Sequence, residues 1–314
     1  MAASMTWTGR LTMPVVLAPM FRVCGPDLVI AASRAGIAGS FPTANCRSTT
    51  ELGEWVGRIS ADLTSDDRRL PWGANLIIKH ARRDADLEVL LAGRPDFVIT
   101  SVGTPAPVVG PLHEAGISVL ADVASVEHAR KAVACGVDGL VLLSAGAGGN
   151  TGWLNPFVFV RAVREFFSGT VVLAGGITDG TAIAAAQVLG CDLVYLGTKA
   201  IAATESMASV GYKQMLVDSS ADDIHLTKAF TGMPTNMLRP SIVAAGLDPA
   251  ALDEDVSPTS ADGTYGGARH DGPGRWSDVW AAGHTVSGVH RSEPIADVVS
   301  GLRADFLHAR SRHL

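Results

Sequence analysis

The sequence is poor in charged residues and in aromatic residues. Only 18% of its 314 residues are charged and 6% are aromatic, whereas 47% are hydrophobic. A chain of this composition can bury a large core, which excludes extended disorder. The net charge is −6 and there is no run of Lys or Arg, which argues against nucleic acid and against an anionic membrane surface as partners. We therefore expect a globular protein whose partner is a small molecule.

Paired cysteines and long apolar segments are also missing. The four cysteines are scattered without a Cys-x-x-Cys pair, so the sequence predicts neither a metal site nor a disulfide framework. No segment reaches the roughly 18 uninterrupted apolar residues that cross a bilayer. The N-terminus lacks the apolar core and the small-residue cleavage site of a signal peptide. We predict a cytoplasmic protein, and the sequence leaves a homodimer open.

Short apolar segments alternate regularly with segments of helical pattern. Near-continuous apolar strands, each followed by a helix, are typical of a parallel sheet that is buried on both faces. Eight such strands exceed the five or six of a usual open doubly wound sheet. The sequence therefore predicts an α/β fold, a closed (β/α)8 TIM barrel. The predicted strands are Met13–Ala18, Ile37–Ser40, Trp72–Ile78, Phe97–Thr100, Ser118–Ala121, Leu140–Leu143, Val171–Ala174 and Leu193–Leu196.

The pattern changes after Thr198. We predict that residues 1–203 and 291–314 form the barrel, and that residues 204–290 form a C-terminal cap, or substrate segment, on its mouth. Within this cap, Ser209–Val217 and Asp222–Ala229 are predicted as helices. Residues 253–290 are rich in Gly, Ser, Asp and Pro and lack periodicity, so a disordered linker is an alternative for residues 255–275.

Glycines follow the last two predicted strands. Gly175 and Gly176 come after one strand, and Gly197 and Thr198 come after the next. Such turns present bare backbone N–H groups at the carboxyl edge of the sheet, where a helix N-terminus also favours negative charge. Two turns in succession predict a phosphate site, although each glycine alone could simply serve a tight turn.

Other loops at the same edge suit a flat ligand. The apolar segment Ala18–Met20 follows the first strand, and the glycine-rich loop Ser144–Gly152 follows the sixth. Because glycine has no Cβ, this loop can lie flat against a ring. Flavin mononucleotide (FMN), pyridoxal phosphate and phosphorylated sugars all fit a ring with a phosphate tail. Pyridoxal phosphate needs a strand-end lysine, for which Lys79 is the nearby candidate, so we favour the flavin.

Five segments resemble, in this order along the chain, the motifs of the nitronate monooxygenases, formerly 2-nitropropane dioxygenases. The resemblance spans about residues 13–200, and TGMPTNML and WAAGHTVSGV further on also look like family segments. It implies an FMN-dependent barrel related to the flavin enoyl reductases. The five segments are VVLAPMFRVCGPDLVIAASRAGIAGSF, GANLI, GAGGNTG, VVLAGGITDG and YLGT.

The resemblance also implies the residues that contact the cofactor. Asp122 is included among them, and it stands where some members of the family carry lysine. Phosphate contacts are implied for Gly175, Gly176, Gly197 and Thr198. The remaining FMN contacts are implied for Ala18, Pro19, Met20, Asn75, Gly148 and Gly149.

The glycine-rich loop departs from the family at its end. The family loop ends Gly-Gly-His, and that histidine is the proposed acceptor of the substrate proton, but here Asn150 stands in its place. An asparagine cannot take a proton at neutral pH, although it can donate a hydrogen bond to a developing oxyanion. We predict Asn150 as a catalytic residue in that sense and His80, which follows the strand carrying Asn75, as the surrogate base.

Three hypotheses about function follow. The first is an FMN-dependent oxidoreductase of nitronate monooxygenase type, which oxidises alkyl nitronates or similar small carbanion-like substrates with O2. The second is a flavin reductase or dehydrogenase that uses NAD(P)H and acts on an enoyl or acyl-thioester (CoA) substrate. The third is a non-catalytic barrel that binds a flavin or a phosphate and has lost its activity along with the histidine.

Overall fold

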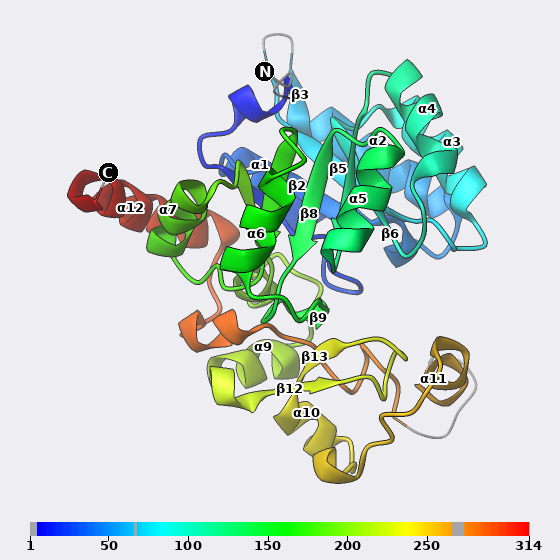
Figure 1. Cartoon of the computed structure of the whole chain (residues 1–314), viewed down its shortest axis with the longest axis vertical. Helices are drawn as coiled ribbons and strands as arrows, with labels where there is room; N and C mark the ends of the chain where they lie inside the picture. Colours follow the sequence, from blue (N-terminus) through cyan, green and yellow to red (C-terminus); the bar gives the residue numbers. More distant parts are fainter. Residues whose placement is uncertain (1–4, 66–67, 266–272, 314) are drawn as a thin grey trace.

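The structure, a computed structural model, describes residues 5–65, 68–265 and 273–313 (Figure 1). Its centre is an eight-stranded parallel sheet in the order β1-β11-β10-β8-β7-β6-β5-β2. A bridge between Val16 and Ala38 joins the two ends of this order, so the sheet closes into a barrel. The predicted TIM barrel is confirmed. The strands are β1 (Val15–Leu17), β2 (Gly39–Pro42), β5 (Trp72–Ile77), β6 (Phe97–Ser101), β7 (Ser118–Val123), β8 (Gly139–Leu143), β10 (Thr170–Ala174) and β11 (Leu193–Leu196).

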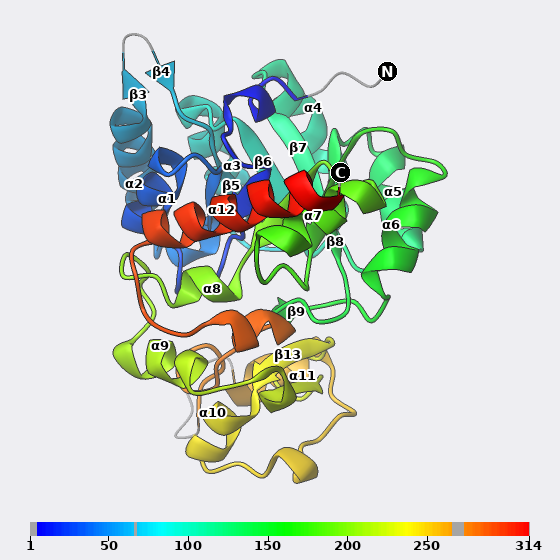
Figure 2. The same ribbon diagram turned by 90° about the vertical axis from the view of Figure 1, so that its left-hand side faces the viewer.

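Helices surround the barrel (Figure 2). The helix after β11, α8 (Thr198–Ile201), has only about one turn. The C-terminal helix α12 (Ile295–His313) packs against α7 and α1, where an eighth helix of the ring would lie. The other helices are α1 (Pro26–Arg34), α2 (Thr49–Leu63), α3 (Arg83–Gly93), α4 (Ala106–Glu114), α5 (Val126–Ala134), α6 (Pro156–Arg164) and α7 (Gly180–Leu189).

The inside of the barrel is a separate apolar cluster. It extends from Phe97, the first residue of β6, to Ala174 and Tyr195 near the carboxyl ends of β10 and β11. Trp7 belongs to this cluster, is 1% exposed and stacks on Phe97 with the ring centroids 4.5 Å apart. The N-terminal segment therefore closes the amino end of the barrel, an element that the sequence analysis did not predict.

A smaller unit lies below the carboxyl end of the barrel in Figure 1. Its three-stranded antiparallel sheet has the order β12-β13-β9. Since β9 belongs to the loop after β8, this sheet joins the unit to the barrel. We retain the division into a barrel and a cap as a proposal. The elements are β9 (Gly149–Asn150), α9 (Val210–Val217), β12 (Ile224–Thr227), β13 (Thr235–Leu238), α10 (Arg239–Ala244) and α11 (Pro258–Tyr265).

One prediction about this unit was wrong. The predicted helix Asp222–Ala229 is instead a 3-10 turn over Ala221–Asp223 followed by strand β12, because Ile-His-Leu-Thr pairs with β13. β-Branched residues favour such pairing. The alternative of a disordered linker does not hold for α11, where Ser257 Oγ accepts a hydrogen bond (3.1 Å) from Ser260 N–H in the first turn of the helix. Residues 266–272 of the suggested linker lie outside the described residues.

Candidate functional site

The strand registers define which residues face the inside of the barrel. Tyr195 lies opposite Val16, Asn75 lies opposite Ile99, and Asp122 lies opposite Val141. Each of these partners belongs to the interior cluster. Because side chains alternate along a strand and partners share a face, Tyr195, Asn75 and Asp122 also point inward. All three lie near the carboxyl ends of their strands, where TIM barrels place their active sites.

The two glycine turns lie at the same end of the barrel. Gly176 has φ +77° and nothing within 4 Å of the position that a Cβ would take. At Gly197 a Cβ would meet only Ala18 Cβ at 3.7 Å and Met20 Sδ at 3.9 Å. Among the described residues, the backbone N–H groups of Gly176 and Gly197 donate to no other group. Free amides beside open space can bind an anion such as a phosphate.

The helix N-terminus beside these turns is not free. The Asp179 side chain caps α7 by accepting a hydrogen bond (2.9 Å) from Ala182 N–H. Thr198 is 5% exposed, and its Oγ1 accepts a hydrogen bond (2.9 Å) from Gly283 N–H. The anion site therefore depends on the glycine amides, and the Thr198 hydroxyl is already bound by the segment around Gly283.

That segment, residues 281–284, crosses from the β11 turn to the loop after β8. His284 N–H donates to Gly146 O (3.0 Å). A Cβ on Gly148 would lie 2.7 Å from Gly283 N, and a Cβ on Gly283 would lie 2.5 Å from Gly146 O. The glycines of the β8 loop thus permit a close backbone approach to residues 281–284. Close backbone packing therefore explains why position 148 is glycine, without a ligand ring.

Asn150 is held by the smaller unit. It lies in β9 opposite Thr235 of β13, whose Oγ1 donates a hydrogen bond (3.1 Å) to Asn150 Oδ1. The residue is exposed. In the part of the chain that the structure describes, its Nδ2 has no hydrogen-bond partner. Asn150 is therefore oriented by its oxygen and presents its amide N–H groups as donors.

Asn75 is fixed across two strands of the barrel. It is 6% exposed, and its Nδ2 donates to Ile99 O and to Ser101 Oγ, both at 3.1 Å. Ser101 was not picked out from the sequence, because a serine that ends a strand has no distinctive pattern. Its hydroxyl helps to set the orientation of the Asn75 amide at the mouth.

The loop after β1 is also locked in place. Cys24 Sγ donates to Ala18 O (3.3 Å) and accepts from Met20 N–H (3.3 Å). Asn45 Nδ2 donates to Met20 O (3.2 Å). The segment of Ala18, Pro19 and Met20 therefore has a defined backbone beside Gly197. Burial and apolar surroundings raise the pKa of the Cys24 thiol to about 12, so it acts as a neutral donor.

Asp122 and Tyr195 leave buried polar atoms without partners. Neither Asp122 Oδ1 nor Tyr195 Oη has a hydrogen-bond partner among the described residues. Burial raises the pKa of the Asp122 carboxyl to about 7. It also raises the pKa of Tyr195, and the nearby Asp122 carboxylate adds to that shift. Tyr195 was missed in the sequence, where it was counted only as an apolar strand residue of the YLGT segment.

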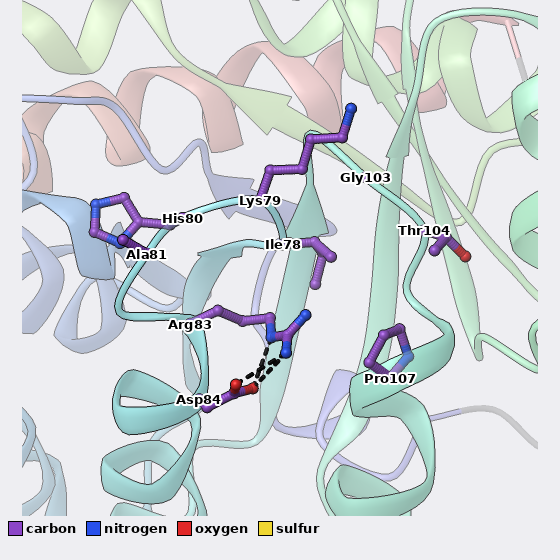
Figure 3. A pocket seen from close by; sticks show the side chains of 9 residues that line it. All are labelled: Ile78, Lys79, His80, Ala81, Arg83, Asp84, Gly103, Thr104 and Pro107. Carbon is purple, nitrogen blue, oxygen red and sulfur yellow. Dashed lines mark hydrogen bonds and ion pairs between the residues drawn. The ribbon is translucent and has the colours of Figure 1, made fainter.

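His80 lies on the outer rim rather than among these groups. It lines a cavity of about 440 Å3 between the loops after β5 and β6. Figure 3 shows the His80 ring and the Lys79 side chain extending in different directions from that loop. His80 Nδ1 accepts a hydrogen bond (3.2 Å) from Arg82 N–H. In the described part of the chain no hydrogen bond or ion pair joins His80 to Asn150, the other predicted catalytic residue, or to Asp122.

The described residues contain neither a cluster of metal ligands nor a membrane-spanning helix. No group of three or more His, Cys, Asp or Glu side chains there could hold a metal ion. No helix there is long and apolar enough to span a membrane.

Sequence comparisons identify similar proteins. A family model described as nitronate monooxygenase matches residues 68–304. A nitronate monooxygenase of Paraburkholderia phytofirmans is 28% identical over 93% of this chain and 92% of its own length. A (3aS,4S,5R,7aS)-5-hydroxy-7a-methyl-1-oxo-octahydro-1H-indene-4-carboxyl-CoA dehydrogenase of Mycobacterium tuberculosis is also 28% identical, over 73% of this chain and 64% of that protein.

Solved structures share the whole architecture. FabK from Thermotoga maritima superposes with a TM-score of 0.83 and 24% identity, covering 99% of this chain and 98% of that one. This likeness concerns the fold alone. A nitroalkane oxidase from Streptomyces ansochromogenes superposes with a TM-score of 0.79 and 26% identity, covering 97% of this chain and 98% of the other.

Proposed function

Because the chain belongs to the nitronate monooxygenase family, a family of flavin-dependent oxidoreductases, we propose that it binds FMN and oxidises alkyl nitronates or similar small carbanion-like substrates with O2. The observation that carries this proposal is the pair of glycine turns, whose free amides lie at the carboxyl end of the barrel. Gly176 and Gly197 would hold the phosphate, with Gly175 and Thr198 shaping the two turns.

The orphaned polar atoms inside the barrel fit such a cofactor. A buried carboxyl oxygen and a buried hydroxyl without partners are costly unless a ligand or water completes their hydrogen bonds. The polar edge of a flavin ring has both donors and acceptors. The ring would lie over Asp122 and Tyr195, flanked by Ala18, Pro19 and Met20 on one side and by Asn75 on another. We propose Gly148 and Gly149 as the backbone wall beside it.

The bound flavin would accept electrons from the substrate. The chain's own residues would exclude water, since the interior cluster is apolar, and would orient the substrate through Asn150. Asn150 Nδ2 can donate to a nitronate oxygen, but it cannot accept a proton from carbon. A nitronate needs no deprotonation, which is why we propose the anion as the substrate. We still propose His80 as a base, but the nitronate reaction does not depend on it, because His80 lies at the rim.

Asn150 also favours a second function. Because Asn150 supplies no base, a reaction that starts with hydride from NAD(P)H and acts on an enoyl or acyl-thioester substrate also suits the site. The CoA dehydrogenase among the relatives is named for an acyl-CoA substrate, which supports this alternative.

One experiment separates these functions. The purified protein should show a flavin absorption spectrum, and FMN should be released on denaturation. Anaerobic mixing with an alkyl nitronate should then bleach the spectrum, and O2 should restore it. Rapid bleaching by NADH or NADPH alone would favour the reductase. A flavin that stays oxidised with every donor would favour a non-catalytic barrel.

Restoring a base at position 150 gives a second test. Asn150→His should raise the ratio of kcat/KM for a neutral nitroalkane to kcat/KM for its nitronate by about 100-fold or more, the usual contribution of a positioned general base. The gain should appear as pH rises through the histidine pKa. Asn150→Ala is the matched control, since it removes the amide without adding a base. If Asn150→His changed kcat/KM equally for the nitroalkane and the nitronate, the absence of a base at position 150 would not be what selects the nitronate.

A further inference from the structure

The strongest unexplained feature is the pair formed by Asp122 on β7 and Tyr195 on β11. Both side chains point into the barrel, from strands on different parts of the closed sheet. Tyr195 belongs to the interior apolar cluster, which also includes Ala147 and Ala174 and has Ala18 packed against it. An acidic side chain in that setting needs a partner, and the described residues supply none for Oδ1.

The charged groups around β7 do not reach this pair. Asp138 lies at the amino end of β7, where it accepts from Val119 N–H (2.7 Å) and pairs with His113 Nε2 (2.9 Å). In the described part of the chain, no salt bridge includes Asp122, and Tyr195 is the titratable group that interacts with it. Helices α4 and α5 pack on the outside of β7 and carry His113, Glu114, Glu127, His128, Arg130 and Lys131.

We propose that Asp122, facing Tyr195 across the barrel interior, is a proton-holding group that couples reduction of the bound flavin to uptake of one additional proton by the protein. This inference rests on the proposed function. The carboxyl would lie under the polar edge of the ring, where negative charge develops on reduction. Carboxylate and reduced ring repel each other, so reduction favours the protonated carboxyl.

The balance of the step is simple. Two electrons come from the substrate or, in a titration, from dithionite. One proton goes to the coenzyme, and one is taken from solvent by the Asp122 carboxylate. When pH is low enough for Asp122 to be protonated in the oxidised protein already, the additional proton is not taken up. Because the pKa of Asp122 is about 7, uptake of the additional proton should begin in the neutral pH range.

The test is the pH dependence of the flavin midpoint potential in the FMN-loaded protein. One additional proton per two electrons changes the equilibrium constant tenfold per pH unit, which is about 30 mV per pH unit for a two-electron couple. Between pH 7 and the higher pKa that the Asp122 carboxyl takes beside the reduced ring, the wild-type potential should fall more steeply than that of Asp122→Asn by this amount. Below pH 6 the two slopes should coincide. Parallel slopes over the whole range would overturn the proposal.

A matched control and a ligand-free measurement complete the design. Tyr195→Phe keeps the ring and removes only the hydroxyl, so it should keep the steep slope, and loss of the slope in this variant would count against Asp122 as its source. Without flavin, a raised carboxyl pKa lowers stability as pH rises from about 4 to 7. The Tm advantage of Asp122→Asn should therefore grow over that range. If the protein binds flavin but the two slopes are parallel, this inference alone is wrong. If the protein binds no flavin, both this inference and the proposed function are wrong.

Discussion

Gly176→Val is expected to yield a folded protein that loses its flavin during purification. Gly176 has φ +77°, has open space at the position that a Cβ would take, and has a backbone N–H that donates to no other group among the described residues. A valine disfavours this backbone conformation and places its methyl groups where the phosphate would lie. Losing one hydrogen bond to a charged group costs about 1.5–3 kcal/mol. The Kd for FMN should therefore rise about 10- to 100-fold or more, measured by fluorescence quenching on titration of the apoprotein with FMN.

The chain offers a close control for backbone strain. Gly116 has φ +74°, is exposed, and also has nothing within 4 Å of its Cβ position, but it lies before β7 at the amino end of the barrel. Gly116→Val should lower the free energy of unfolding by about 1–2 kcal/mol, as Gly176→Val should, and leave the Kd for FMN unchanged. Equal effects of both substitutions on FMN binding would remove the phosphate role from Gly176.

The barrel could be predicted because its signal is local and repeated. Each strand is an apolar segment of a few residues, and several helices begin at a recognisable capping residue, as where Ser48 Oγ accepts from Glu51 N–H at α2. Both features depend on neighbours in sequence. The two glycine turns were predictable for the same reason, since the strand end and the glycine are adjacent.

The contacts that complete the site depend on residues far apart in sequence. Asn150 is oriented by Thr235, and Thr198 is bound by Gly283, each across about 85 positions. No local pattern indicates such pairs. The strand β12 was mistaken for a helix because its partner β13, rather than its own propensity, decides its conformation. Tyr195 was overlooked because its importance comes from facing Asp122 across the barrel.

Trp7→Ala is expected to be among the most destabilising single substitutions in this chain. Trp7 is 1% exposed and stacks on Phe97 inside the amino end of the barrel. Replacing a buried tryptophan by alanine leaves a large cavity and typically costs about 3–5 kcal/mol. The loss should be read from the midpoint of urea unfolding at an unchanged m-value. Because the site lies at the opposite end, flavin binding to the remaining folded protein should change far less than stability.

Two further variants separate packing from other effects of the indole. Trp153 is 79% exposed, so Trp153→Ala should change the free energy of unfolding by less than about 0.5 kcal/mol. Trp7 Nε1 has no hydrogen-bond partner among the described residues, and this unmet donor lowers stability. Trp7→Phe keeps an aromatic ring against Phe97 and removes that donor, so it should recover most of the stability that Trp7→Ala loses. If Trp7→Phe were as unstable as Trp7→Ala, the stacked ring would not be what closes the barrel.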